Sequence, residues 1–260
     1  MDAAFVHVRR ESAVARVFLA RPRTRNAFNA ELIAQLRSVF QQLDKEDDVR
    51  VITLQGEGKI FCGGADIAWM QASQTLTREE NIEEARAMAR MFRTIDRMSK
   101  PVVGRIHGAA LGGGAGLAAV CDIVIASEDT VFGFTESKFG LLPAVISPFV
   151  AAKIGHSHLR ALALTGERFD ARRALHIGLA HFVVPHPKLD RTVARTVAEL
   201  LTASPTAIAA AKALFAQVAY TPDEETVDLT ARAIAAQRMT PEGQDGMLAF
   251  LEKRPASWVR

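Results

Sequence analysis

The stretch ALGGGAGLA, from Ala110 to Ala118, sets four glycines between a short apolar strand pattern and a short helix pattern. A second glycine loop, FCGGADI (Phe61–Ile67), likewise follows an apolar strand pattern and introduces a helix. Glycine permits positive φ angles and close approach of the backbone, and a helix N-terminus carries unpaired N–H donors. Two such loops brought together would aim two N–H groups at one oxygen, which is the geometry of an oxyanion hole.

Other interpretations of the glycine loops are weaker. Neither the phosphate-binding pattern G-x-x-x-x-G-K-[ST] nor the dinucleotide pattern G-x-G-x-x-G occurs, and no G-x-S-x-G supplies a nucleophilic serine. The purely structural alternative stays open for either loop alone, because glycines also make tight turns and let helices pack closely.

Strand and helix patterns alternate around the two loops. The expected strands are Ala13–Leu19, Val49–Leu54, Pro101–Ile106, Ile123–Ala126 and Val131–Gly133. The expected helices are Ala30–Leu43, capped by Asn29, and a helix that ends near Met98 and begins with a capping box of Thr77 and Glu80.

The pattern becomes purely helical near the C-terminus. From Leu189 onward we find only helical patterns, and Pro205, Pro222 and Pro241 each stand where a helix would start. The sequence therefore predicts an α/β body over residues 1–187 and a helical region over residues 188–260.

Composition excludes several classes of protein. Hydrophobic residues make up 49% of the 260 positions, which is enough for a sizeable core, and no apolar run approaches the roughly 18 residues of a membrane span. The net charge of +3 is spread along the chain, unlike the basic stripe of a nucleic-acid binder. The first ten residues lack the apolar core of a signal peptide, and the two cysteines suggest no disulfide framework. We expect a cytoplasmic protein that binds neither membranes, nucleic acids nor metal ions.

Several motifs together resemble the enoyl-CoA hydratase, or crotonase, family. Phe61–Ile67 resembles that family's F-C-A-G-A-D-I segment, and Lys100–Ser127 resembles its glycine-rich segment that ends in C-D. Phe132–Ala144 is similar to its F-G-x-P-E-x-x-L-G-x-x-P segment. The similarity extends in order from NAFN (Asn26–Asn29) to FLEKRPASW near the C-terminus, so it covers most of the chain.

The resemblance implies a fold and an assembly. The fold would be a ClpP/crotonase-type spiral of strand–strand–helix turns, with a helical C-terminal region that packs subunits together. The assembly would be a homotrimer or a dimer of trimers. The ligand would be an acyl-CoA thioester, and no cofactor is expected because CoA is part of the substrate.

The resemblance also implies roles for individual residues. The N–H groups of Ala65 and Gly113 would form the oxyanion hole, and Glu136 would be the acid/base. Ala27, Asp66 and Ile67 would line the CoA site. To the substrate-binding residues we add three from the local sequence: Trp69 as a wall of the acyl pocket, Phe134 as part of an apolar setting for Glu136, and Gly116.

The sequence departs from typical hydratases at position 116. Those enzymes use two glutamates, and the first would fall where this chain has Gly116. The segment LLPAVISPF (Leu141–Phe149) is similar to bacterial methylglutaconyl-CoA and isohexenylglutaconyl-CoA hydratases, which act on branched, carboxylated esters. We expect Gly116 to widen the pocket and remove a negative charge, which would suit such an acyl group.

Three functions therefore remain open. The first is hydration of a 2-enoyl-CoA, branched or carboxylated in its acyl part. The second is a single-glutamate reaction such as 3,2-enoyl-CoA isomerisation or decarboxylation, because one carboxylate can shuttle a proton between two carbons. The third is a CoA-ester binding protein without catalysis, which Gly116 favours and Glu136 opposes.

Overall fold

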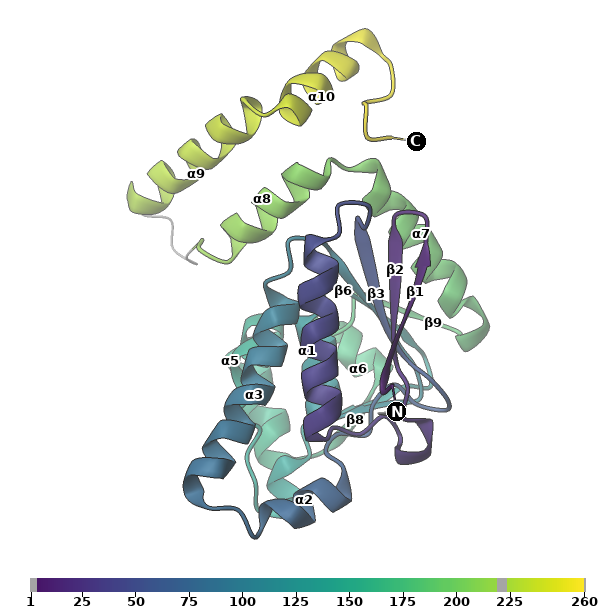
Figure 1. The fold of residues 1–260 in the computed structure, drawn as a ribbon, viewed down its shortest axis with the longest axis vertical. Helices are drawn as coiled ribbons and strands as arrows, with labels where there is room; N and C mark the ends of the chain where they lie inside the picture. Colours follow the sequence, from purple (N-terminus) through teal and green to yellow (C-terminus); the bar gives the residue numbers. More distant parts are fainter. Residues whose placement is uncertain (1–3, 219–223, 260) are drawn as a thin grey trace.

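The computed structural model describes residues 4–218 and 224–259 (Figure 1). Its main sheet has six strands in the order β1-β2-β3-β4-β6-β9, antiparallel between β1 and β2 and parallel elsewhere. These strands are β1 (Val6–Glu11), β2 (Val14–Leu19), β3 (Val51–Gly56), β4 (Val102–Ile106), β6 (Ile123–Ser127) and β9 (Phe182–Val184). A second sheet has the order β5-β7-β8, from β5 (Ala109–Leu111), β7 (Val131–Gly133) and β8 (Arg168–Asp170).

The helices that follow the strands cover both faces of the main sheet. The α-helices are α1 (Ala30–Lys45), α2 (Ile67–Ser73), α3 (Arg78–Asp96), α4 (Gly113–Val120), α5 (Ser147–Thr165), α6 (Ala171–His176), α7 (Leu189–Thr202), α8 (Pro205–Phe215), α9 (Glu224–Arg238) and α10 (Pro241–Glu252). Short 3-10 turns lie at Pro22–Thr24, Glu136–Phe139 and His186–Lys188.

Alternation along the parallel strands gives the sheet two apolar faces. Ile52 and Leu54 of β3 point into the large core beneath α1 and α3, whereas Val51, the residue before Ile52, joins a smaller core with Leu189 and Val193 of α7. All six residues of β3 are buried, as expected for a parallel strand covered on both sides. Figure 1 shows α1 and α3 on one side of this sheet and α7 on the other.

Most of the predicted helix starts have the predicted caps. The Asn29 side chain accepts the N–H of Leu32 at the start of α1, and Thr77 and Glu80 form the capping box of α3. Pro205 and Pro241 each begin a helix, α8 and α10, whereas Pro222 lies outside the described residues. The ends differ by two residues, since α1 continues to Lys45 and α3 stops at Asp96.

The C-terminal helices divide into two groups. Helix α7 packs on the main sheet and so contributes to the core of the body. In contrast, α8, α9 and α10 extend beyond it (Figure 1). The Arg50 guanidinium joins the two ends of this region, donating to the carbonyl oxygens of Leu201 and Ala203 at the end of α7 and of Trp258 after α10. In the described part of the chain, no helix has both the length and the hydropathy required to cross a membrane.

Candidate active site

The two glycine loops lie directly against each other. The N–H of Cys62 donates to the Ala109 carbonyl and the N–H of Leu111 donates to the Cys62 carbonyl, each with a nitrogen–oxygen distance of 3.0 Å. A Cβ atom added at Gly114 would lie 2.6 Å from the Cys62 carbonyl oxygen, closer than real side chains tolerate. Glycine at 114 is therefore what allows the start of α4 to approach the first loop.

Each loop presents one backbone N–H without an acceptor. Around Ala65, the N–H of Phe28 donates to the Gly64 carbonyl (2.7 Å) and the N–H of Asp66 donates to the Phe28 carbonyl (2.9 Å), which leaves the Ala65 N–H unused. Gly113 is the first residue of α4, where an N–H has no partner within the helix. Across residues 4–218 and 224–259, neither N–H group has a hydrogen-bond acceptor.

Glu136 lies beside the second of these donors. Its Oε1 is 3.1 Å from the point where a Cβ of Gly112 would stand, and Gly112 immediately precedes the Gly113 donor. Gly112 adopts a φ of +50°, and its N–H donates to the Gly133 carbonyl of β7, the strand that leads to Glu136. This hydrogen bond holds the loop that carries the Gly113 donor next to the strand that leads to Glu136.

The Glu136 carboxyl group is incompletely satisfied. Its Oε2 atom is buried and lacks a hydrogen-bond partner within the described residues. Burial raises the pKa of Glu136 above its usual value of 4.5, against a smaller lowering by its own backbone N–H. A half-buried carboxyl group with one unpaired oxygen and a raised pKa, next to the Gly113 donor, is suited to exchanging protons with a bound substrate.

Phe134 lies in the hydrophobic core rather than on the surface of the site. Phe134 is fully buried and packs against Phe169, with ring centroids 5.9 Å apart, while Phe132 stacks on the same ring at 5.8 Å. The rings of Phe132 and Phe134 form part of the core close to Glu136 in the sequence, and the apolar setting of its carboxyl group stays a prediction. Direct contact between Phe134 and substrate is not present, because the ring has no exposed surface.

Gly116 does not widen a pocket, so that prediction is wrong. A Cβ atom at Gly116 would lie 2.4 Å from Cγ2 of Ile146 and 3.2 Å from Cε1 of Phe92. Gly116 itself is buried, and Ile146 is only 2% exposed. The space left by the missing side chain is filled by Ile146, which comes from the same Leu141–Phe149 segment that departs from the typical hydratase pattern.

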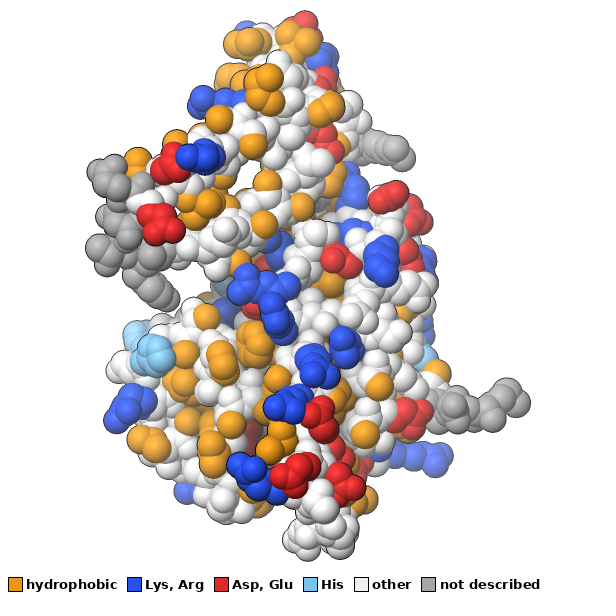
Figure 2. Space-filling model, turned by 60° about the vertical axis from the view of Figure 1, so that its left-hand side comes forward, with side chains coloured by type: hydrophobic (Ala, Val, Ile, Leu, Met, Phe, Trp, Pro, Cys, Tyr) orange, Lys and Arg blue, Asp and Glu red, His pale blue; other side chains and the backbone are white. Residues whose placement is uncertain are grey.

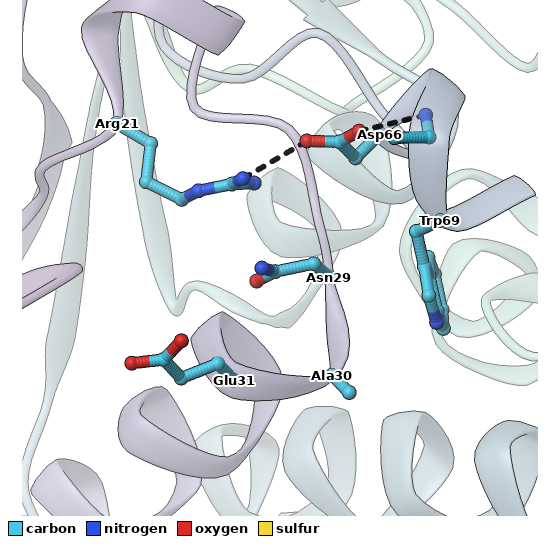
Figure 3. A pocket seen from close by; sticks show the side chains of 7 residues that line it. Arg21, Asn29, Ala30, Glu31, Asp66 and Trp69 are labelled. Carbon is cyan, nitrogen blue, oxygen red and sulfur yellow. Dashed lines mark hydrogen bonds and ion pairs between the residues drawn. The ribbon is translucent and has the colours of Figure 1, made fainter. Parts of the chain in front are cut away.

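A surface pocket of about 360 Å³ lies next to the first glycine loop (Figure 3). Asp66 is one of the residues that line it, accepting the N–H of Ala68 with Oδ1 (2.9 Å) and pairing with Nη2 of Arg21 through Oδ2 (2.9 Å). Although partial burial opposes ionisation, the hydrogen bonds from Arg21 and Ala68 lower the pKa of Asp66. The lining residues are Arg21, Asn29, Ala30, Glu31, Asp66, Ala68 and Trp69.

The predicted CoA-site residues gather around this pocket. Arg21 also donates to the carbonyl of Ala27, which is nearly buried, whereas Ile67 at the start of α2 is 74% exposed. The Trp69 ring is held by a hydrogen bond from its Nε1 to Glu84 of α3 (3.1 Å). Sequence reasoning missed Arg21. The one available signal was its position before the NAFN loop, and only the fold shows that Asp66 returns to that loop.

Comparisons with known proteins agree with this geometry. A family model described as enoyl-CoA hydratase/isomerase matches residues 9–260. A Thermus thermophilus protein named as an enoyl-CoA hydratase is 34% identical over 93% of this chain and 96% of its own length. A crotonyl-CoA hydratase of Syntrophomonas wolfei is 30% identical over 96% of each chain. A crystal structure of an enoyl-CoA hydratase from Shewanella pealeana aligns with a TM-score of 0.95 and 34% identity, covering 99% of this chain and 97% of that one.

These matches confirm the resemblance and the fold predicted from the glycine loops and the surrounding motifs. The matched region spans the α/β body and the C-terminal helices alike. The chain belongs to the enoyl-CoA hydratase/isomerase family and has its crotonase fold.

Proposed function

We propose that this protein adds water across the double bond of a 2-enoyl-CoA thioester. The observation that carries the proposal is that the two unpaired N–H groups, at Ala65 and Gly113, come from adjoining loops with the Glu136 carboxyl group beside them. Two such donors bind a thioester oxygen more strongly as it gains negative charge, which is the basis of oxyanion stabilisation.

One carboxylate is sufficient for the reaction. Ionised Glu136 takes a proton from a water molecule as the water oxygen bonds to the β-carbon of the ester. The electron pair of the double bond moves toward the thioester, whose oxygen becomes negative between the N–H groups of Ala65 and Gly113. Neutral Glu136 then returns a proton to the α-carbon, so that one water is added and the carboxylate is restored.

The pocket beside Asp66 suits the CoA end of the substrate. Ala27, Asp66 and Ile67 lie at or next to it, and Arg21 adds a cation that is already oriented by two oxygen atoms. Trp69 stands between this pocket and α3, where it can contact the acyl arm. The reaction needs no cofactor other than the CoA that the substrate brings.

A branched, carboxylated acyl group is the proposed substrate type. The support is the Leu141–Phe149 segment and the missing charge at Gly116, since one carboxylate fewer reduces repulsion of an anionic acyl group. Pocket size does not support this substrate type, because Ile146 fills the space at Gly116. Crotonyl-CoA, which names the substrate of one relative, is the reference ester.

Isomerisation of a 3-enoyl-CoA is the second candidate. It is favoured by the presence of Glu136 together with apolar Ile146 at the place of a second acid/base group. In that reaction the carboxylate removes a proton from one carbon and returns it to another, with no addition of water.

We further propose that the protein works in the cytoplasm as a trimer or a dimer of trimers. Large apolar side chains stand exposed on the C-terminal helices, and Figure 2 shows apolar groups gathered over that part of the molecule. Phe215, Met239, Phe250 and Leu251 are each more than 70% exposed in the single chain. Burial between subunits would remove this surface from water.

A panel of esters tests the proposal. Purified protein is incubated with crotonyl-CoA, 3-methylglutaconyl-CoA and a 3-enoyl-CoA, and the conjugated enoyl absorbance and product masses are followed. Loss of conjugation with the mass gain of one water establishes hydration. Conjugation that appears from the 3-enoyl ester at constant mass establishes isomerisation, and no change with any ester contradicts both.

A further inference from the structure

Position 116 has no room for a side chain. A Cβ atom there would lie 2.4 Å from Cγ2 and 3.0 Å from Cβ of Ile146, and 3.2 Å from Cε1 of Phe92. The first contact is with a branched side chain close to its own backbone, so a small rotation of a flexible end cannot relieve it. Even alanine at this position would displace its neighbours.

The neighbours are themselves fixed. Ile146 is 2% exposed and directly precedes α5, where its carbonyl accepts the N–H of Val150 over 3.0 Å. Phe92 is fully buried between two other rings, with centroid distances of 6.1 Å to Phe28 and 5.9 Å to Phe149. Ile146 and these rings form a closed apolar block against α4.

This block borders the reacting end of the site. Gly116 lies three residues, about one helical turn, after the free N–H of Gly113. The Phe28 ring also lies against Gly113, with its Cε2 atom 2.8 Å from the position of an added Cβ. The Glu136 carboxyl group lies against Gly112, the residue before Gly113. The first turn of α4 thus has a carboxyl group next to Gly112 and apolar groups next to Gly113 and Gly116.

We infer that Ile146 is a specificity-determining residue of this enzyme, because it fills the place of a second acid/base side chain and leaves proton transfer to Glu136 alone. The inference rests on the proposed function. Gly116 and Ile146 are in this account a matched pair, in which neither position can change without the other. A second carboxyl group would help to position the water that is added. Without it, the rate of hydration exceeds the rate of isomerisation at the same site by a smaller factor.

The packing half of the inference is tested without any substrate. Gly116→Ala alone should lower the melting temperature by about 3 °C or more, because overpacking a full core is costly. Adding Ile146→Ala should offset part of that loss. The melting temperature of the double variant should then fall by less than the two single variants' decreases added together. Adding Val150→Ala instead, at another buried residue in the first turn of α5, should give additive shifts. Additive shifts in both pairs would overturn the matched-pair assignment.

The specificity half is tested with two double variants that differ by one functional group. Gly116→Glu/Ile146→Ala should raise the ratio of crotonyl-CoA hydration to 3-enoyl-CoA isomerisation about tenfold or more over the wild type. Its isosteric control, Gly116→Gln/Ile146→Ala, lacks the ionisable group and should not. Equal ratios in the two double variants would overturn the inference.

The two failures are distinguishable. A wild-type protein that turns over none of the esters removes the proposed function and the role of Ile146 in specificity with it. The melting-temperature coupling between positions 116 and 146 would then still establish or overturn their packing as a pair. Active wild type with equal double variants contradicts the inference about Ile146 alone.

Discussion

The two candidate N–H donors of the site come from the backbone, whereas its proton-transfer groups depend on which side chains stand at positions such as 136, where this chain has Glu136, and 116, where it has none. On the donor side, the close approach of Gly114 to the Cys62 carbonyl and the positive φ of Gly112 leave little freedom to substitute. On the other side, Glu136 is present and the partner position has become Gly116, with Ile146 in its place. The difference teaches that the backbone donors are fixed by the packing of the glycine loops, whereas the proposed acid/base groups can be exchanged by substituting single side chains.

The largest expected effect comes from removing the one carboxyl group. Glu136→Gln should reduce kcat by roughly 10²–10⁴-fold, because an amide cannot exchange protons with water and carbon in turn. Binding of the CoA ester, measured by calorimetry, should change little. A variant with full turnover would contradict the assignment of Glu136, and loss of binding as well would indicate a structural role.

The next largest effect on kcat should come from disturbing the packing of the two glycine loops that hold the N–H donors. Gly114→Ala places a Cβ against the Cys62 carbonyl and should push the two loops apart, lowering kcat by about 10²-fold or more, the order of a lost oxyanion donor. The matched control is Gly104→Ala in β4, whose Cβ would meet Sγ of Cys121 at 3.0 Å. The control should lower the melting temperature and leave kcat of the folded enzyme intact. Equal kcat in both variants would show that loop contact does not matter.

The Arg21–Asp66 pair should affect binding more than chemistry. Arg21→Lys loses the fork that joins the Ala27 carbonyl to the Asp66 carboxylate, so KM for CoA esters should rise roughly tenfold with a smaller change in kcat. Arg16→Lys is the control, because its pair with Glu11 is exposed and contributes little. Equal KM values in the two variants would remove Arg21 from the binding site.

The smallest expected effect is on stability, and it opposes the effect on activity. Burial raises the pKa of Glu136, so its contribution to folding is greatest at low pH and falls as pH rises through the folded-state pKa. Glu136→Gln removes this charge and should leave the melting temperature at neutral pH unchanged or slightly higher. A clear drop, measured by thermal unfolding, would mean that the carboxylate stabilises the fold instead.

The features that sequence predicts here are local or framed by motifs. The capping box of Thr77 and Glu80 and the helix start at Pro205 follow from short-range rules, and the structure has both. The two glycine loops are also local, and their joint use in one site follows from the family resemblance. Confirmation of the fold came from the comparisons over nearly the whole chain.

The features that sequence missed depend on packing between distant segments. Ile146 lies 30 positions after Gly116, and nothing in either segment alone shows that one fills the space of the other. Arg21 and Asp66 lie 45 positions apart, and their contact appears only once the first glycine loop folds back onto the NAFN segment. Phe134 stands two residues before Glu136, and that spacing alone does not show whether its ring is exposed. The ring is buried because it packs against Phe169, which is distant in the sequence.

The pH dependence of kcat/KM for crotonyl-CoA tests the single-carboxylate site most directly. Hydration requires ionised Glu136, so kcat/KM should rise with pH through one ionisation above 4.5 to a plateau, and the remaining activity of Glu136→Gln should lose that step. A bell-shaped profile that persists in Glu136→Gln would contradict the account, because other groups would then move the protons.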